Sequence, residues 1–212
     1  MTAPRRSPRL AFGGLAMTCV FFLLIPPAFS RETPRLVAAK VPTLKTLPSK
    51  CIGKDCFEWT ADVGGKTVPL RGAGLFRYLR ADLYSAALYV PEEIKTTDIL
   101  ADVPKALLFV CHHDIKKEDI LRVSDKNLRG NPTVDYKKIQ RRLEKLNAFY
   151  KTVKDGDYYR ILYSPGHGTV VEYNGRERIL ILGEDFARAY FGMWISKYSI
   201  NQKFRKELLD LK

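Results

Sequence analysis

Short stretches of alternating apolar and polar residues, bounded by glycine, proline and asparagine, recur along this chain and predict β-strands. Gly64-Gly65 and Asn174-Gly175 are two-residue turn signals that join neighbouring stretches into hairpins. Pro165-Gly166-His167-Gly168 is a third turn, and Gly72 and Gly74 separate two further stretches. The predicted strands are residues 57–63, 66–70, 75–80, 82–90, 106–112, 157–163, 169–173 and 178–182.

Four other segments follow a helical period. The clearest spans residues 136–150, where Tyr136, Ile139 and Leu143 begin an apolar stripe that continues to its end. Gly130-Asn131-Pro132 ends the helix before it. Together these patterns predict an α+β domain, in which a large antiparallel β-sheet is covered on one face by helices. The predicted helices are residues 116–127, 136–150, 185–197 and 202–211.

The first thirty residues have the composition of a signal peptide. Three arginines precede an apolar run at residues 10–25, and Ala28-Phe29-Ser30 offers small residues at the positions that a signal peptidase reads. We expect cleavage after Ser30 and export to the periplasm or the medium. The alternative is an uncleaved membrane anchor, although the apolar run is shorter than the roughly 20 residues of a spanning helix. The predicted organisation is signal peptide 1–30, flexible lead-in 31–50 and folded domain 51–212.

The chain is strongly basic, with a formal net charge of +13 that falls to +10 once the three signal-peptide arginines are removed. An exported protein has little access to nucleic acid, so we expect no nucleic-acid partner. The charge suits peripheral contact with an anionic membrane surface, polyanionic envelope material or an acidic ligand, and it equally fits a solvated surface. The densest basic run lies on the outer face of a predicted helix without interleaved aromatic residues. It comprises Lys137, Lys138, Arg141, Arg142 and Lys145.

The cysteines of the predicted mature chain indicate an oxidising compartment. Cys51 and Cys56 flank a glycine-containing reversal, which favours a short-range disulfide. A metal site is the competing interpretation, but no second cysteine pair is present to complete four ligands. Cys111 lies in an apolar strand and is interpreted as a small core residue.

Other candidate chemistry is sparse. His112 and His113 are adjacent at the end of a predicted strand, where neighbouring side chains point to opposite faces and do not share a metal. The sequence has no nucleophile elbow, phosphate-binding glycine loop or zinc-protease helix. We therefore expect no metal and no cofactor.

Two ordered sets of residues resemble the signatures of a known family. The first is Gly72-Ala73-Gly74 followed by a strand that ends in Ala86-Ala87-Leu88-Tyr89. The second runs from Tyr163-x-Pro165-Gly166-x-Gly168-Thr169 through Asn174-Gly175 to Asp185-Phe186-Ala187-Arg188-Ala189. In this order they resemble the chalcone isomerase superfamily, most closely its bacterial exported branch. The resemblance implies an open-faced sandwich fold.

The resemblance also implies a site. Plant enzymes of this superfamily use an arginine, a threonine, a tyrosine and an asparagine, whereas the fatty-acid-binding branch holds a carboxylate with an arginine and a tyrosine. Tyr84 stands at the enzymes' threonine position, which favours the carboxylate-binding pattern. Strict register places Phe76 at the arginine position and Arg77 one residue later, where a bulge would restore its orientation. Asn127 stands in for the amide, and Met193 occupies a position where the enzymes have a polar residue.

We therefore predict a non-catalytic binder of a small hydrophobic ligand or a fatty-acid-like carboxylate, anchored by Arg77 and Tyr84. Asn127 and Met193 complete the predicted site. Three alternatives remain open. Arg77 pairs with a surface acid while Tyr84 is a half-buried strand aromatic; the protein is an intramolecular lyase acting on a flavonoid-like phenol; or it is an envelope interaction module without a small ligand. The predicted apolar lining is Leu83, Ala87, Phe186, Tyr190 and Met193.

Overall fold

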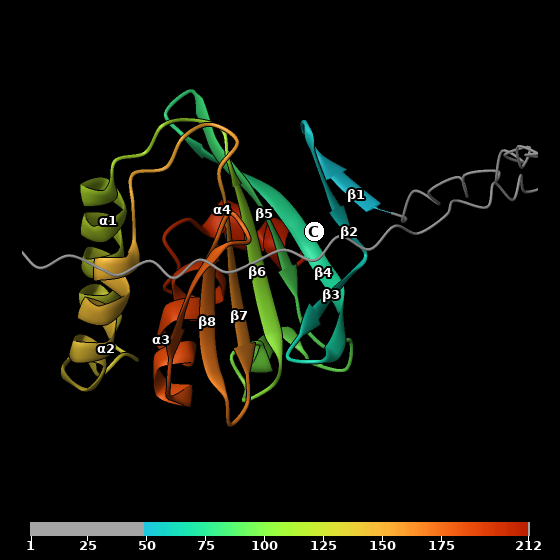
Figure 1. The fold of residues 1–212 in the computed structure, drawn as a ribbon. Coiled ribbons are helices and arrows are strands. Elements are labelled where there is room, and N and C mark those ends of the chain that lie inside the picture. The colour runs from blue at the N-terminus through green and yellow to red at the C-terminus, as the bar shows by residue number, and fades with distance from the viewer. Residues whose placement is uncertain (1–48, 212) are drawn as a thin grey trace, which may run out of the picture. The chain divides into compact units, whose positions relative to one another are not determined.

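The computed structural model describes residues 49–211, which form a seven-stranded antiparallel sheet, a separate two-stranded hairpin and four α-helices (Figure 1). The predicted signal peptide and the lead-in up to residue 48 lie outside the described residues. Strands of the large sheet are hydrogen-bonded in chain order, so the predicted α+β fold is confirmed. They are β3 (Thr60–Val63), β4 (Lys66–Tyr78), β5 (Ala81–Tyr89), β6 (Lys105–Cys111), β7 (Tyr158–Ser164), β8 (Gly168–Tyr173) and β9 (Glu177–Ile181).

The helices lie on one side of this sheet, and they pack on it or on one another. Helix α3 contacts β8, helix α4 contacts β4 and β5, and helices α1 and α2 pack against α3. A short 3-10 turn, η1 (Thr96–Asp98), lies between β5 and β6. The helices are α1 (Lys117–Gly130), α2 (Tyr136–Phe149), α3 (Glu184–Ile195) and α4 (Gln202–Leu208).

The sheet carries a hydrophobic core on each face. Along β6, Leu107 and Phe109 belong to the core beneath the helices, whereas Ala106 and Leu108 belong to the core on the opposite face. This alternation is the period of two that a strand imposes. The opposite face is therefore not bare, and its buried residues are Phe57, Val63, Val68, Ala73, Ala87, Tyr89 and Ala106.

Strand β4 corrects the prediction that Gly72 and Gly74 separate two strands. Both glycines lie inside one continuous strand, with a register shift between Leu70 and Gly72. Helix α4 lies directly over them: a Cβ added at Gly72 would stand 2.6 Å from the carbonyl oxygen of Leu208. The glycines therefore permit a helix to approach the strand closely rather than interrupting it.

The predicted strand at residues 57–63 is also corrected, because it divides at Trp59 between two sheets. Strand β2 (Asp55–Glu58) pairs with β1 (Ser49–Ile52) in a separate hairpin, and β3 begins the large sheet. Cys51 and Cys56 stand opposite each other in this hairpin and form a disulfide, as predicted. Cys111 is a buried free cysteine of the core, also as predicted.

A buried polar contact fastens this hairpin to the sheet. Asp55 of β2 accepts a hydrogen bond from Ser85 of β5 and contacts His112, whose Nε2 lies 2.5 Å from Asp55 Oδ2. The Asp55 and His112 side chains are only 13% and 8% exposed. Tyr89 adds a hydrogen bond from its hydroxyl to the carbonyl oxygen of Glu58, at 2.9 Å.

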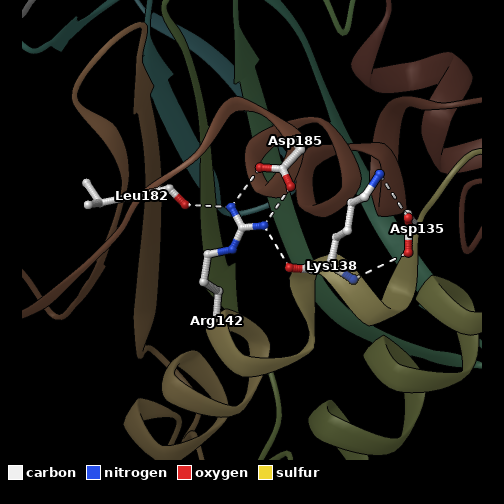
Figure 2. A network of polar contacts seen from close by, with 5 residues as sticks. All are labelled: Asp135, Lys138, Arg142, Leu182 and Asp185. Carbon is white, nitrogen blue, oxygen red and sulfur yellow. Dashed lines mark hydrogen bonds and ion pairs between the residues drawn. The ribbon is translucent and has the colours of Figure 1, made fainter.

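A second polar network joins α2 to the start of α3 (Figure 2). The Arg142 guanidinium forms two hydrogen bonds with the Asp185 carboxylate, at 2.7 and 2.6 Å, and donates to the carbonyl oxygen of Leu182 at 3.0 Å. This bidentate geometry holds the pKa of Asp185 below its usual value. Arg142 therefore serves the fold, although the sequence places it in the solvent-facing basic run.

Candidate ligand-binding site

Tyr84 lies at the centre of an aromatic cluster between the sheet and the helices. Phe76 is its direct partner across β4 and β5, and the two rings stack with centroids 4.7 Å apart. Phe109 and Phe204 each meet the Tyr84 ring edge-on at 5.6 Å. The lining of this position is therefore aromatic on three sides.

The Tyr84 side chain is partly buried against the core beneath the helices. Burial raises its pKa well above the usual value, while a hydrogen bond with the Trp194 side chain acts in the opposite direction. The nearby Cys111 thiol contributes a smaller rise. Tyr84 is therefore a neutral hydroxyl at ordinary pH and not a general base.

Arg77 is not part of this cluster. The β4–β5 register shifts between Phe76 and Arg77, so that Arg77 pairs with Asp82. Its Nε lies 2.6 Å from Asp82 Oδ1, and 59% of its side chain is exposed. The bulge does not bring Arg77 inward, because Phe76 already fills the inward position opposite Tyr84. The structure therefore shows the alternative pairing of Arg77 with a surface acid.

The other two predicted residues lie on different helices. Asn127 of α1 donates through Nδ2 to the carbonyl oxygen of Tyr198 at 2.9 Å, so it ties α1 to the segment after α3. Its Oδ1 is buried and has no hydrogen-bond partner among the described residues. Met193 of α3 is completely buried in the core beneath the helices. Of the four predicted residues, Arg77 therefore lies at the surface, whereas Tyr84 and Met193 belong to the core beneath the helices.

Lys105 is a buried cation that the sequence analysis did not select. It opens β6, is 2% exposed and faces the helices, on the same side of the strand as Leu107 and Phe109. Its ammonium donates to the carbonyl oxygens of Ala101 at 2.5 Å and Ile99 at 3.4 Å. No carboxylate lies within salt-bridge distance of it in residues 49–211.

Burial, together with the positive charge of Arg188, lowers the pKa of Lys105 to about 8. Asp102 and Glu184 act in the opposite direction from outside salt-bridge range. The ammonium also lies 5.7 Å from the centre of the Tyr163 ring, whose hydroxyl donates to Asp102. A charge kept in such a poorly solvated position favours any anion that can reach it.

Tyr84 and Lys105 mark opposite ends of one apolar layer. Tyr84 is opposite Cys111 at the end of β6, and Lys105 begins that strand. The six residue steps between them correspond to about 20 Å at a rise of about 3.3 Å per residue. Leu107 and Phe109 line the sheet side of this layer, and residues of α3 cover it.

Two tyrosines add polar groups to this layer. The hydroxyls of Tyr150 and Tyr190 hydrogen bond to each other, and both side chains are buried. Burial raises the pKa of Tyr150 to about 12 and raises the pKa of Tyr190 well above its usual value. This pair is neutral and already satisfied, so it provides no charge for a ligand.

The layer is filled by side chains in this structure. The two best-defined hollows in the described part of the chain are open surface depressions elsewhere, one beside Tyr173 and Arg176 and one beside Val68 and Glu92. Among residues 49–211, no group of three or more His, Cys, Asp or Glu side chains is arranged to hold a metal ion. Over the same residues, no helix has the length and apolar character required to cross a membrane.

The sequence carried only weak signals for the residues that it missed. Lys105 directly follows Pro104 and precedes an apolar strand, where a lysine is normally assigned to the strand edge. Asp55, Ser85 and His112 are far apart in the chain, so no local pattern relates them. The one indication of a buried Lys105 was its position two and four residues before Leu107 and Phe109, which places all three side chains on the same face of the strand.

The comparisons with known proteins agree with this architecture. The family model described as chalcone isomerase-like matches residues 52–210. A solved structure, a fatty-acid binding protein of Arabidopsis thaliana (AtFAP1), superposes with a TM-score of 0.58 at 14% sequence identity. The match covers 77% of this chain and 96% of that one. No curated protein matches the chain by sequence. With the seven-stranded sheet, its helical cover and this match over most of its length, the chain belongs to the chalcone isomerase-like family.

Proposed function

We propose that this protein is a non-catalytic binder of a fatty acid or a similar amphipathic carboxylate. The ligand lies in the layer between the sheet and α3, with its carboxylate at Lys105 and its apolar tail directed towards Tyr84. The observation that carries the proposal is the buried Lys105 ammonium, which has no carboxylate partner among the described residues. The fatty-acid binding function of the structurally similar Arabidopsis protein supports it.

The dimensions of the layer suit an acyl chain. The hydrocarbon core of a bilayer is about 30 Å thick, so one extended chain spans about half of that. The distance of about 20 Å between Lys105 and Tyr84 along β6 accommodates such a chain and its head group. Because the layer is occupied by side chains, binding requires some of them to move aside. The short helix α4, which contributes Phe204 to the Tyr84 cluster, is the element that we expect to move.

The small number of polar groups near Tyr84 favours ligand binding over isomerisation as the function. The groups near its hydroxyl are the Trp194 side chain and the Cys111 thiol, and Arg77 faces away. Ring closure of a flavonoid-like phenol requires polar partners that organise the substrate and a water, as the resemblance to the plant enzymes implies. Phe76 and Met193 are apolar at two of the positions where those enzymes have polar groups.

A second candidate function is an interaction module that carries no small ligand. The filled aromatic layer favours it, because Phe76, Tyr84 and Phe204 already pack on one another. The two candidates differ in one observable property, which is whether a carboxylate displaces these side chains.

Calorimetric titration of the protein with oleate and with methyl oleate distinguishes the candidates. We expect the wild-type protein to bind oleate more tightly than the ester, and Lys105→Met to lose about tenfold in oleate affinity while its affinity for the ester is unchanged. Lys138→Met is the matched control, because the Lys138 side chain is 74% exposed on α2. Equal oleate affinity in wild type and Lys105→Met would refute the role of Lys105 as the carboxylate anchor. If neither compound binds, the result would favour an interaction module without a small ligand.

We also propose that the protein acts outside the cytoplasm. The Cys51–Cys56 disulfide supports this location, because disulfides persist in oxidising compartments. The intact mass of the protein recovered from its expressing cells tests the proposal: a chain that begins at Arg31 is expected, and a full-length chain would indicate retention of the apolar segment.

A further inference from the structure

The turn between β4 and β5 presents an apolar surface to solvent. Tyr78 ends β4 and is 62% exposed, and Leu79 follows it with 89% of its surface exposed. Leu79 has the largest exposure among the exposed large hydrophobic residues of the described chain. The hairpin projects past the neighbouring strands at the top of Figure 1, so this tip, residues 77–80, is the outermost part of the sheet at that end.

Leu79 is held there in an unfavourable backbone conformation. Its φ is +56°, and the described chain has two other non-glycine residues with positive φ, Asn174 and Asp210. Asparagine and aspartate tolerate this region, whereas a leucine there costs roughly 1–2 kcal/mol. In a two-residue hairpin turn, the position with positive φ is normally occupied by glycine or asparagine. The fold alone therefore gives no reason for a leucine at this position.

Two arginines flank the apolar pair. Arg77 precedes Tyr78, and Arg80 follows Leu79; both are exposed. Asp82 neutralises part of the Arg77 charge, while Arg80 has no salt bridge within residues 49–211. An aromatic and an aliphatic side chain between two arginines match a lipid interface, where the apolar groups enter the acyl region and the guanidinium groups remain with the phosphates.

We propose that the β4–β5 tip is a membrane-docking element that inserts Tyr78 and Leu79 into an anionic lipid surface. We infer a bilayer as the partner because Leu79 combines the largest side-chain exposure with a strained backbone. We infer that the lipid is anionic because two arginines flank the apolar pair. Tyr78 of the tip is two residues beyond Phe76 on β4, so docking brings the Tyr84 end of the apolar layer to the lipid surface. The proposal goes beyond ligand binding and does not depend on it.

Co-sedimentation with phosphatidylcholine vesicles, with and without phosphatidylglycerol, tests this proposal. We expect the wild-type protein to partition onto the phosphatidylglycerol vesicles and to be released by salt. Leu79→Asn removes the apolar side chain and suits the positive φ, so it should lower partitioning about tenfold while the melting temperature stays the same or rises. A loss of binding in a protein that is at least as stable cannot arise from misfolding.

Two further variants complete the test. Leu182→Asn is the control, because Leu182 is 62% exposed next to β9 and is not part of the tip; its partitioning should equal that of wild type. In Tyr78→Trp, the fluorescence of the new tryptophan should shift to the blue on anionic vesicles. Brominated lipids should quench this fluorescence. Equal partitioning of wild type and Leu79→Asn would overturn the proposal, as would wild-type self-association through the tip without vesicle binding.

Discussion

At the scale of single residues, the orientation of a side chain decides what this protein can bind. Phe76 and Arg77 are neighbours on β4, yet one stacks on Tyr84 inside the domain and the other pairs with Asp82 at the surface. Local pattern placed both in one strand, but a register shift between them determined which faces inward. Lys105 shows the same dependence, since only its burial between β6 and α3 distinguishes it from a surface lysine.

Lys105 should give the wild-type protein a characteristic pH dependence of stability. Its pKa is about 8 in the folded protein against 10.5 ordinarily, so above pH 8 the unfolded chain holds a proton that the folded protein has lost. The contribution of Lys105 to the free energy of unfolding therefore rises with pH, by about 2 kcal/mol between pH 8 and pH 10. Below pH 8 both states are protonated and this contribution is constant.

Urea unfolding of wild type and Lys105→Met at several pH values checks this expectation. The variant lacks the ammonium, so the free energy of unfolding of the wild type should rise by about 2 kcal/mol relative to that of the variant between pH 8 and pH 10. Both proteins should also lose stability as the pH rises above about 9, because the buried Cys111 thiol and buried tyrosines such as Tyr150 have raised pKa values and ionise first in the unfolded chain. Parallel profiles for the two proteins between pH 8 and pH 10 would contradict the placement of Lys105.

At the scale of elements, the contact between β4 and α4 determines how the Tyr84 cluster is closed. Gly72 and Gly74 lie under α4, and Glu207 of that helix accepts a hydrogen bond from the backbone N–H of Leu75 at 3.0 Å. Phe204 reaches the cluster from the same helix. The two glycines were recognised in the sequence, but as an interruption between strands, because local pattern contains no information about a helix that packs across the strand.

Gly72→Ala should displace α4. The new Cβ would stand 2.6 Å from the carbonyl oxygen of Leu208 and 2.7 Å from that of Glu207, and both are backbone atoms that move only with the helix. We expect a loss of about 2 kcal/mol in the free energy of unfolding, measured by urea denaturation. Gly130→Ala is the control, since a Cβ at this last residue of α1 meets nothing within 4 Å. Unchanged stability in Gly72→Ala would show that α4 does not lie against the strand.

At the scale of the whole molecule, one sheet separates two cores with different covers. Helices enclose one face, while the disulfide-linked β1–β2 hairpin covers part of the other. Asp55 links the hairpin to Ser85 and His112 across the sheet. The contacts that attach the hairpin therefore lie on the opposite face of the sheet from the layer in which we place the ligand.

Asp55→Ala should loosen the hairpin and leave the seven-stranded sheet folded. The substitution leaves Ser85 and His112 without their buried partner, at a cost of about 1–3 kcal/mol. Hydrogen exchange should accelerate in residues 49–58 while β5, β6 and β7 stay protected. Asp155→Ala removes an exposed ion pair to Lys54 of the same hairpin and should have little effect. Acceleration throughout the sheet would mean that the hairpin is integral to the main fold.

The sequence by itself determined the α+β class, the positions of most strands and helices, the Cys51–Cys56 pairing and the family resemblance. These depend on periodicity, turn residues and short separations, which a chain displays locally. Tertiary structure decided that Arg77 faces solvent, that α4 covers Gly72, that Lys105 is buried, and that Asp55 meets His112. Each of these depends on a register shift or on contact between elements far apart in the chain, where a displacement of one residue reverses which side chain faces the interior.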